Sequence, residues 1–302
     1  MKIGVIGAGV MGKNHIRVLS ELRLVREVLV FDLDGTAAAQ AADAVGATVA
    51  PSLEALVDEA DAVSICVPTP YHLATAERLA SAGVPMLIEK PVCACVEEGE
   101  RLMDAVPSGL VTGVGQIERF NPVVEEVARL VSQPLYVEMK RHNPASSRVM
   151  GTSVIEDLMI HDIDILAHIL FPGAPYQVVA AGGDDVCSAL FSFGSCHADI
   201  SASRKSSKKI RSLYIEEEDL TIEADFMTQE VYVYRKPDRY THNGGRYVQE
   251  NIIEKLLVNR VEPLRVELLD FISAVAGGPA FPVTLAQGVE NLRIADAIQA
   301  AL

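Results

Sequence analysis

The amino-acid sequence predicts an α/β protein of two domains. The first is an N-terminal, doubly wound parallel sheet, and the second is a C-terminal α+β domain built on a largely antiparallel open sheet. Apolar runs alternate with helix-like stretches over about the first 115 residues, which is typical of βαβ units. Beyond them, strand-like segments follow one another and alternate between apolar and polar residues, as in an antiparallel sheet with one covered face. We place the domains at residues 1–118 and 119–302.

The N-terminal domain is predicted to contain five buried strands with helices between them. Each apolar run is short and rich in β-branched residues, and each is bounded by breakers. The strands are expected over residues 2–7, 27–32, 62–67, 85–90 and 109–115, and helices over 35–46, 69–83 and 96–106.

The C-terminal domain is predicted to begin with a strand and a helix before its main run of strands. The strand is expected over 134–142, the helix over 155–170, several strands over 176–234, and two closing helices near 262–276 and 284–301.

Composition excludes several classes of protein. The formal net charge of -15 makes nucleic acid and anionic membranes unsuitable as general partners. The chain contains no apolar stretch of transmembrane length. Its five cysteines form an odd set without a C-x-x-C pair, which disfavours a disulfide framework and a zinc ribbon. We therefore expect a cytoplasmic protein.

A glycine array follows the first predicted strand and opens a helix. Gly7, Gly9 and Gly12 have G-x-G-x-x-G spacing, which allows a tight turn, close approach of a pyrophosphate and close helix packing. Asp32 ends the second strand, 20 residues after Gly12, where a carboxylate can accept both ribose hydroxyls and repels a 2′-phosphate. The pattern predicts NAD binding, with NADP disfavoured. The alternative is a glycine turn that binds no phosphate, beside a chance acid.

Two further strands end in polar residues that we expect at the same sheet edge. Pro68, Thr69 and His72 follow the third strand and are candidate contacts to the nicotinamide ribose, although they are also ordinary turn residues. Glu89 and Lys90 end the fourth strand before a proline, which can continue neither a strand ladder nor a helix. A surface Glu–Lys pair is the alternative. The residues expected to bind the cofactor are Gly7, Gly9, Val10, Met11, Gly12, Asp32, Pro68, Thr69, His72, Glu89 and Lys90.

The predicted helix over 155–170 carries a polar stripe beside an apolar one. Asp157 and His161 are four residues apart and therefore share a face, and Asp164 and His168 continue it. Burial of such groups is costly without a partner or a task. Three interpretations remain open: a satisfied structural pair, a metal site, and acid–base chemistry in which Asp157 orients His161. The metal site lacks any strong ligand spacing, so we expect none.

Together these motifs resemble the Gfo/Idh/MocA oxidoreductases, named for glucose-fructose oxidoreductase and inositol dehydrogenase. The resemblance covers nearly the whole chain and rests on GAGVMG at 7–12, EKP at 89–91, D-x-x-x-H-x-x-D at 157–164 and the segment 262–275. It implies a Rossmann domain that binds the dinucleotide, followed by a substrate-binding and oligomerisation domain. The family's open sheet often forms a subunit interface, so a homodimer or homotetramer is expected. Met159 departs from the glycine frequent in the family, and its bulk could narrow the pocket.

The resemblance also implies the chemistry, with Lys90, Asp157 and His161 around a substrate carbon that faces the nicotinamide. The expected reaction is oxidation of a secondary alcohol. His161 takes the hydroxyl proton and Lys90 hydrogen-bonds the developing alkoxide. A catalytically silent dinucleotide-binding regulator is the alternative from a different class.

The expected substrate is a sugar or nucleotide sugar, with a UDP-N-acetylhexosamine oxidised at C3 as the specific prediction. Residues 115–122 and 156–166 look closer to the family's UDP-N-acetylglucosamine branch than to its inositol or glucose enzymes. The basic cluster at 204–211 could meet a diphosphate, or it could be a solvated turn. An inositol or simple-sugar dehydrogenase is the alternative. The candidate substrate-binding residues are Lys90, Arg119, Arg141, Arg148 and His161.

Overall fold

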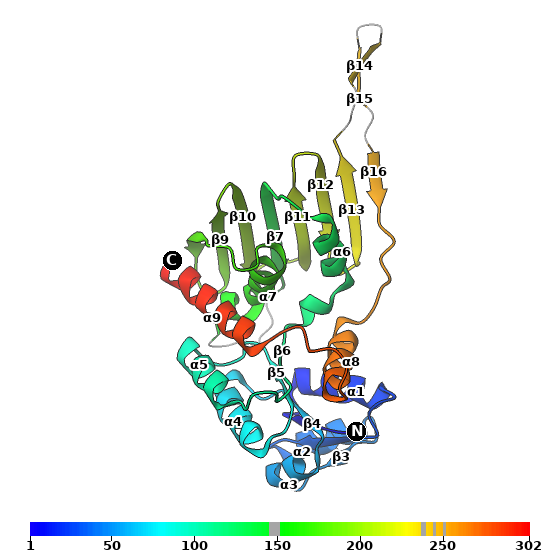
Figure 1. The fold of residues 1–302 in the computed structure, drawn as a ribbon, viewed down its shortest axis with the longest axis vertical. Helices are drawn as coiled ribbons and strands as arrows, with labels where there is room; N and C mark the ends of the chain where they lie inside the picture. Colours follow the sequence, from blue (N-terminus) through cyan, green and yellow to red (C-terminus); the bar gives the residue numbers. More distant parts are fainter. Residues whose placement is uncertain (145–151, 237–239, 244–245, 250–251) are drawn as a thin grey trace. The chain divides into compact units, whose positions relative to one another are not determined.

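The computed structural model describes the chain except for residues 145–151, 237–239, 244–245 and 250–251, and only the backbone within 240–249. The chain forms two compact units (Figure 1). The first unit contains residues 1–120 and 262–293, and the second contains 121–261 and 294–302.

The first unit is a six-stranded parallel sheet covered by helices. Its strand order is β3-β2-β1-β4-β5-β6, and every pairing is parallel. The chain reverses direction across the sheet between β1 and β4, which creates the crevice where doubly wound sheets bind ligands. The elements are β1 (Lys2–Ile6), α1 (Val10–Glu21), β2 (Glu27–Phe31), α2 (Gly35–Asp43), β3 (Thr48–Val49), α3 (Leu53–Glu59), β4 (Ala62–Ile65), η1 (Thr69–Tyr71), α4 (His72–Ala82), β5 (Met86–Glu89), α5 (Val96–Ala105), β6 (Thr112–Gly115), η2 (Ile117–Phe120) and α8 (Pro263–Val275).

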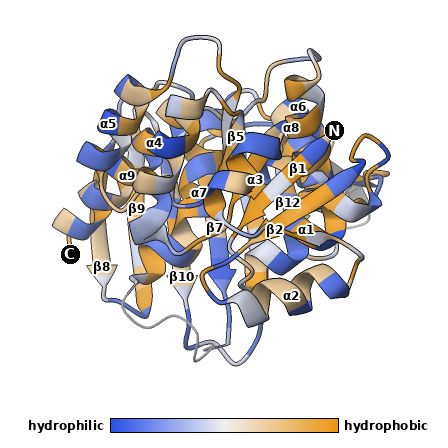
Figure 2. Ribbon diagram, turned by 90° about the horizontal axis from the view of Figure 1, so that it is seen from below, coloured by the Kyte–Doolittle hydropathy of each residue, from blue (hydrophilic) through white to orange (hydrophobic). Residues whose placement is uncertain are grey.

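The sequence explains where these elements begin and end. The side chains of Asp34 and Ser52 accept backbone N–H groups at the starts of α2 and α3. Gly83 ends α4 with φ 69°, in the left-handed region that glycine favours. Strands β4 and β5 are buried throughout, as expected for a sheet covered on both faces. Figure 2 shows hydrophilic residues on α4 and α5 and mainly apolar residues along β1 and β2.

The first unit also includes helix α8. The domain boundary predicted at residue 118 assigns this helix to the second domain. The reason is its apolar face. Leu264, Leu268, Phe271 and Ile272 are buried in the same core as the parallel sheet. The segment therefore returns to the first unit after the chain has built the second. The division of cofactor and substrate binding between the two domains stays a prediction.

The second unit is an eight-stranded, mostly antiparallel sheet. Its order is β16-β13-β12-β11-β7-β10-β9-β8, and β7 with β10 is its parallel pair. Burial alternates along β7 and β9, so one face is covered and the other is open. The strands are β7 (Tyr136–His142), β8 (Gln177–Gly182), β9 (Val186–Phe193), β10 (Cys196–Ser203), β11 (Ile210–Glu216), β12 (Leu220–Asp225), β13 (Glu230–Arg235), β16 (Ile252–Lys255) and the separate hairpin of β14 (Tyr240–Asn243) and β15 (Arg246–Gln249).

Helices cover one face of this sheet. Helix α6 (Pro122–Leu130) packs against β12 and β13. The predicted helix over 155–170 is present as a continuous segment, with a π-helical turn, η3 (Ile155–Met159), before α7 (Ile160–Ile165) and another, η4 (Leu166–Leu170), after it. Helix α9 (Leu285–Ala300) closes the chain, and its residues belong to the first unit up to Arg293 and to the second unit from Ile294 onward. Among the described residues, no helix has both the length and the apolar character of a membrane span.

Candidate active site

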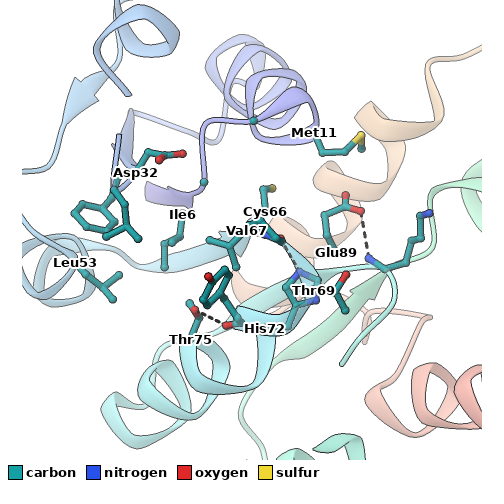
Figure 3. A pocket seen from close by; sticks show the side chains of 17 residues that line it. Ile6, Met11, Asp32, Leu53, Cys66, Val67, Thr69, His72, Thr75 and Glu89 are labelled. Carbon is teal, nitrogen blue, oxygen red and sulfur yellow. Dashed lines mark hydrogen bonds between the residues drawn. The ribbon is translucent and has the colours of Figure 1, made fainter. Parts of the chain in front are cut away.

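The first unit contains a pocket of about 700 Å³ at the carboxyl ends of its strands. Figure 3 shows Asp32 on one side of this pocket and Glu89 on the other, with Cys66 and Val67 between them. The glycine turn, the end of β2, the segment after β4 and Lys90 complete the lining. The residues singled out from four separate strand ends therefore meet around one pocket.

The glycine turn has the geometry that a bound pyrophosphate needs. Gly7 has φ +100°, and a Cβ on Gly12 would lie 1.8 Å from the Gly7 carbonyl oxygen, so both positions require glycine. A Cβ on Gly9 would meet no protein atom within 4 Å, which leaves room for a phosphate at the start of α1. Asp32 is held beside the turn, since its Oδ2 accepts the Ala8 N–H at 2.6 Å. The residues present fit a dinucleotide.

His72 lies at the pocket but is engaged in the fold itself. Its Nδ1 lies 2.9 Å from the Pro91 carbonyl oxygen and its Nε2 2.9 Å from that of Val67. Burial lowers the pKa of this imidazole below its ordinary value. His72 thus joins the segment after β4 to the segment after β5, while Pro68 and Thr69 line the pocket and stay predicted ribose contacts.

The E-K-P segment at residues 89–91 is fixed by hydrogen bonds of the buried Glu89 side chain. Glu89 is 6% exposed, and its Oε2 accepts the backbone N–H of Lys90 at 3.2 Å. Its Oε1 lies 2.8 Å from Nε2 of His15. The Lys90–Pro91 peptide bond is cis. Lys90 is half-buried and lines the pocket, so Glu89 and Lys90 are not a solvated surface pair.

Sequence reasoning missed His15, which is completely buried on α1. Its Nδ1 lies 2.7 Å from Oγ of Ser64. The helical spacing of the sequence could have indicated its burial, because His15 lies on the same face of α1 as Gly12, Ile16 and Leu19, which points into the core. Together with Glu89 and Glu267 it forms a set that could offer metal ligands within the described part of the chain.

In the second unit, Asp157 and His161 occupy one helical segment, with Asp157 in the middle of η3 and His161 in the first turn of α7. Asp157 is partly exposed, and its Oδ2 accepts from Nε of Arg204 at 3.3 Å. Asp157, Arg204 and Lys209 line a pocket of about 280 Å³ together with Asn143. Because Lys90 belongs to the other unit, the predicted gathering of Lys90, Asp157 and His161 stays a prediction.

The structure argues against one predicted substrate contact. Arg141 is 1% exposed, and its Nη2 and Nε lie 2.6 and 3.1 Å from Oδ1 of Asp162. Its guanidinium also faces the ring of Phe226. Arg141 is therefore a buried member of an ion pair and cannot meet a diphosphate in this conformation. Arg119 is the third residue of η2 and is half-buried, whereas Arg148 lies outside the described residues.

The parallel sheet with its glycine turn and Asp32 defines a dinucleotide-binding Rossmann fold, and comparison with known proteins identifies the class of enzyme. Residues 1–115 match the Gfo/Idh/MocA model, described as an oxidoreductase family with an NAD-binding Rossmann fold. A UDP-N-acetylglucosamine 3-dehydrogenase of Acidithiobacillus ferrooxidans is 32% identical over 286 residues, which cover 91% of this chain and 89% of the relative. The chain therefore belongs to this family and is an enzyme of the dehydrogenase type, which confirms the predicted class.

Three further comparisons, one with a sequence and two with solved structures, define the range of relatives. An inositol 2-dehydrogenase of Saccharopolyspora erythraea is 35% identical over 188 residues, or 56% of this chain and 54% of the relative. The solved structure of the Acidithiobacillus ferrooxidans enzyme superposes with a TM-score of 0.88 at 29% identity, covering 100% of this chain and 97% of that one. A levoglucosan dehydrogenase in complex with NADH and L-sorbose has a TM-score of 0.80 at 20% identity, covering 100% and 96%, and shares the fold.

Proposed function

We propose that the protein oxidises the C3 hydroxyl of a UDP-N-acetylhexosamine with NAD. The observation that carries this proposal is the likeness to a UDP-N-acetylglucosamine 3-dehydrogenase over about nine-tenths of both chains. The site is compatible with it, since the pocket of the first unit suits a dinucleotide and Lys90 lies on its lining.

The glycine turn and Asp32 would hold the cofactor. The helix N-terminus after Gly9 favours the pyrophosphate, and the Asp32 carboxylate accepts ribose hydroxyls. The same carboxylate repels a 2′-phosphate, so we propose that NAD is preferred over NADP. When bound, the nicotinamide supplies the hydride acceptor.

The chain's own residues handle the proton and the developing charge. His161, in its neutral form, accepts the proton of the substrate hydroxyl, and Asp157 orients the imidazole. Lys90 donates a hydrogen bond to the oxygen as negative charge develops on it. Glu89 fixes the backbone of Lys90 by accepting its N–H, which limits the positions that the ammonium group can take.

Charge in the second unit supports a nucleotide-sugar substrate. Arg204 and Lys209, from the basic segment at 204–211, line the same pocket as Asp157. Arginine binds phosphate oxygens in bidentate fashion, and lysine adds a point charge. In our proposal for the diphosphate contact, Arg141 is replaced by the exposed Lys209 and by Arg204, which reaches the same pocket although it is 8% exposed and bonded to Asp157.

An inositol or simple-sugar dehydrogenase is the second candidate, favoured by the 35% identity to an inositol 2-dehydrogenase over about half of the chain. A silent regulator is less well supported, because Lys90, Asp157 and His161 are all present.

We also propose a homodimer or homotetramer formed through the open face of the eight-stranded sheet.

The deciding experiment compares UDP-N-acetylglucosamine, free N-acetylglucosamine and myo-inositol under identical conditions, with NADH absorbance as the readout. We expect the nucleotide sugar to be turned over fastest. Faster turnover of either unphosphorylated compound would overturn the nucleotide-sugar assignment, and absence of turnover across a wide polyol panel would favour a regulator. Size-exclusion chromatography with light scattering tests the oligomer.

A further inference from the structure

Three acid–base side chains meet at the wall of the cofactor pocket of the first unit, which Glu89 lines. His15 comes from α1, Glu89 from the end of β5 and Glu267 from α8. They are 0%, 6% and 0% exposed, and one ligand-type atom from each lies within 4.8 Å of the others. Glu89 already has a role in the mechanism described above, whereas His15 and Glu267 have none.

The cluster connects the cofactor helix to the E-K-P segment through short contacts. His15 projects from α1, whose first turn begins at the glycine array. Its Nε2 lies 2.8 Å from Oε1 of Glu89, and the other carboxylate oxygen of Glu89 accepts the Lys90 N–H at 3.2 Å. A line of two hydrogen bonds therefore joins the helix proposed to hold the pyrophosphate to the residue proposed to meet the substrate oxygen.

The charges in the cluster favour a protonated His15. Two carboxyl groups and one imidazole share a space closed to solvent, where an uncompensated charge is costly. Burial lowers the pKa of His15, while Cys66 and Glu89 raise it, and the resulting pKa lies well above the ordinary value of 6.5. An imidazolium donates from both nitrogens, so Nδ1–H can bond Oγ of Ser64 while Nε2–H bonds Glu89.

The geometry distinguishes this arrangement from a metal centre. Two ligands at roughly 2.0–2.2 Å from a tetrahedral ion lie about 3.3–3.6 Å apart. The His15 Nε2 and Glu89 Oε1 atoms are 2.8 Å apart, which is a hydrogen-bond distance. The nitrogen on the other side of the ring is in hydrogen-bond contact with Ser64.

We propose that His15 and Glu267 are positioning residues that fix Lys90 relative to the cofactor helix by holding the Glu89 carboxylate in place. His15 bonds the carboxylate directly. Glu267 is completely buried and packs against this pair from α8, with one carboxylate oxygen within 4.8 Å of a ring nitrogen of His15 and of a Glu89 oxygen. This inference rests on the proposed role of Lys90. It explains how the distance between helix α1 and the catalytic lysine is kept fixed.

The test uses His15→Gln and Glu267→Gln in the full chain, with Lys13→Gln on the exposed side of α1 and Glu262→Gln at the start of α8 as controls. We measure NAD affinity by titration calorimetry, kcat with the working substrate, and amide hydrogen exchange of the peptide containing Lys90. The two cluster variants should lower kcat by roughly tenfold or more through misplacement of Lys90. NAD affinity should change less than threefold, exchange at Lys90 should rise, and the controls should match the wild type.

Hydrogen exchange keeps this test independent of the substrate. If no sugar is oxidised, the proposed function fails, yet faster exchange at Lys90 in the cluster variants still supports the positioning role. Unchanged exchange, or loss of NAD affinity in step with kcat, would overturn it. A stoichiometric metal ion that is present in the wild type and absent from Glu267→Gln would also overturn the positioning role. If His15→Gln does not fold, Ser64→Ala removes one of the two imidazole bonds and should cause a smaller change in the same direction.

Discussion

Charged groups are held differently in the two units. In the first unit, backbone N–H groups hold the carboxylates at the sheet edge: Asp32 accepts from Ala8, and Glu89 accepts from Lys90. In the second unit, arginine side chains hold the carboxylates of the helical segment, with Arg204 bound to Asp157 and Arg141 to Asp162. A backbone donor is fixed once the strand and turn have formed, whereas a side-chain partner depends on which distant strand packs against the helix.

The two arginine–aspartate pairs also differ in exposure. This difference indicates which pair has a purely structural role and which pair can take part in binding or catalysis. The Arg141–Asp162 pair is 1–2% exposed, whereas Asp157 is 25% exposed and lines a pocket. A carboxylate that reaches a pocket can orient a base or meet a ligand, and a fully enclosed pair can only stabilise or specify the fold. The predictions below test this division.

Lys90→Met should have the largest effect on activity. The ammonium group is assigned to the developing alkoxide, so kcat should fall by about 10²–10⁴-fold. NAD affinity should stay within a few-fold, because the glycine turn and Asp32 are untouched. Steady-state kinetics and titration calorimetry measure the two quantities, and near-normal kcat on the true substrate would make Lys90 structural.

His161→Ala should reduce turnover by a comparable factor, about 10²-fold or more, by removing the proton acceptor. It should leave NAD affinity unchanged, since the residue belongs to the other unit. Chelators should have no effect on the wild type. Loss of activity in chelator, restored by a divalent ion, would instead support the metal interpretation of the polar helix.

Arg141→Met should act on stability. Removing the guanidinium that faces the buried Asp162 carboxylate should lower the free energy of unfolding by about 3–5 kcal/mol. The matched control is Arg235→Met, which breaks an exposed pair with Glu254 and should change stability little. Urea denaturation measures both. Equal effects would contradict the distinction between enclosed and exposed pairs.

The Asp32→Ser, Leu33→Arg double variant should shift cofactor preference towards NADP. It removes the carboxylate that repels a 2′-phosphate and adds a cation at a highly exposed position on the pocket lining. The ratio of kcat/KM values for NAD and NADP should change by roughly tenfold, equivalent to about 1.4 kcal/mol. Leu33→Arg alone is the control. A wild type that prefers NADP would refute the assigned role of Asp32.

The smallest expected effect is a pH dependence of stability from His15. The His15 imidazole lies close to Glu89, Glu267, Cys66 and Ser64. Because the pKa of His15 in the folded protein lies well above 6.5, the stabilisation that its protonated form provides is fully present below pH 6.5. The stabilisation is lost as pH rises through the folded pKa. The difference in unfolding free energy between wild type and His15→Gln should therefore shrink with rising pH in urea denaturation series. A difference that grows with pH would contradict a protonated His15.

Local patterns in the sequence determined the order of elements and part of the cofactor site. Glycine spacing and strand-end position depend only on neighbours along the chain, so Gly7, Gly12 and Asp32 could be placed in advance. The helical period likewise placed Asp157 and His161 on one segment, which the structure contains with π-helical turns at both ends.

Tertiary structure alone decided which charged groups are paired. His15 and Glu89 are 74 residues apart, and Arg141 and Asp162 are 21 apart, so no local spacing links them. Their contacts follow from how α1 lies on the parallel sheet and how the helical segment lies on β7. The return of α8 to the first unit, which brings Glu267 to His15, is of the same kind. The burial that makes these pairings necessary arises only when distant segments have excluded water from between them.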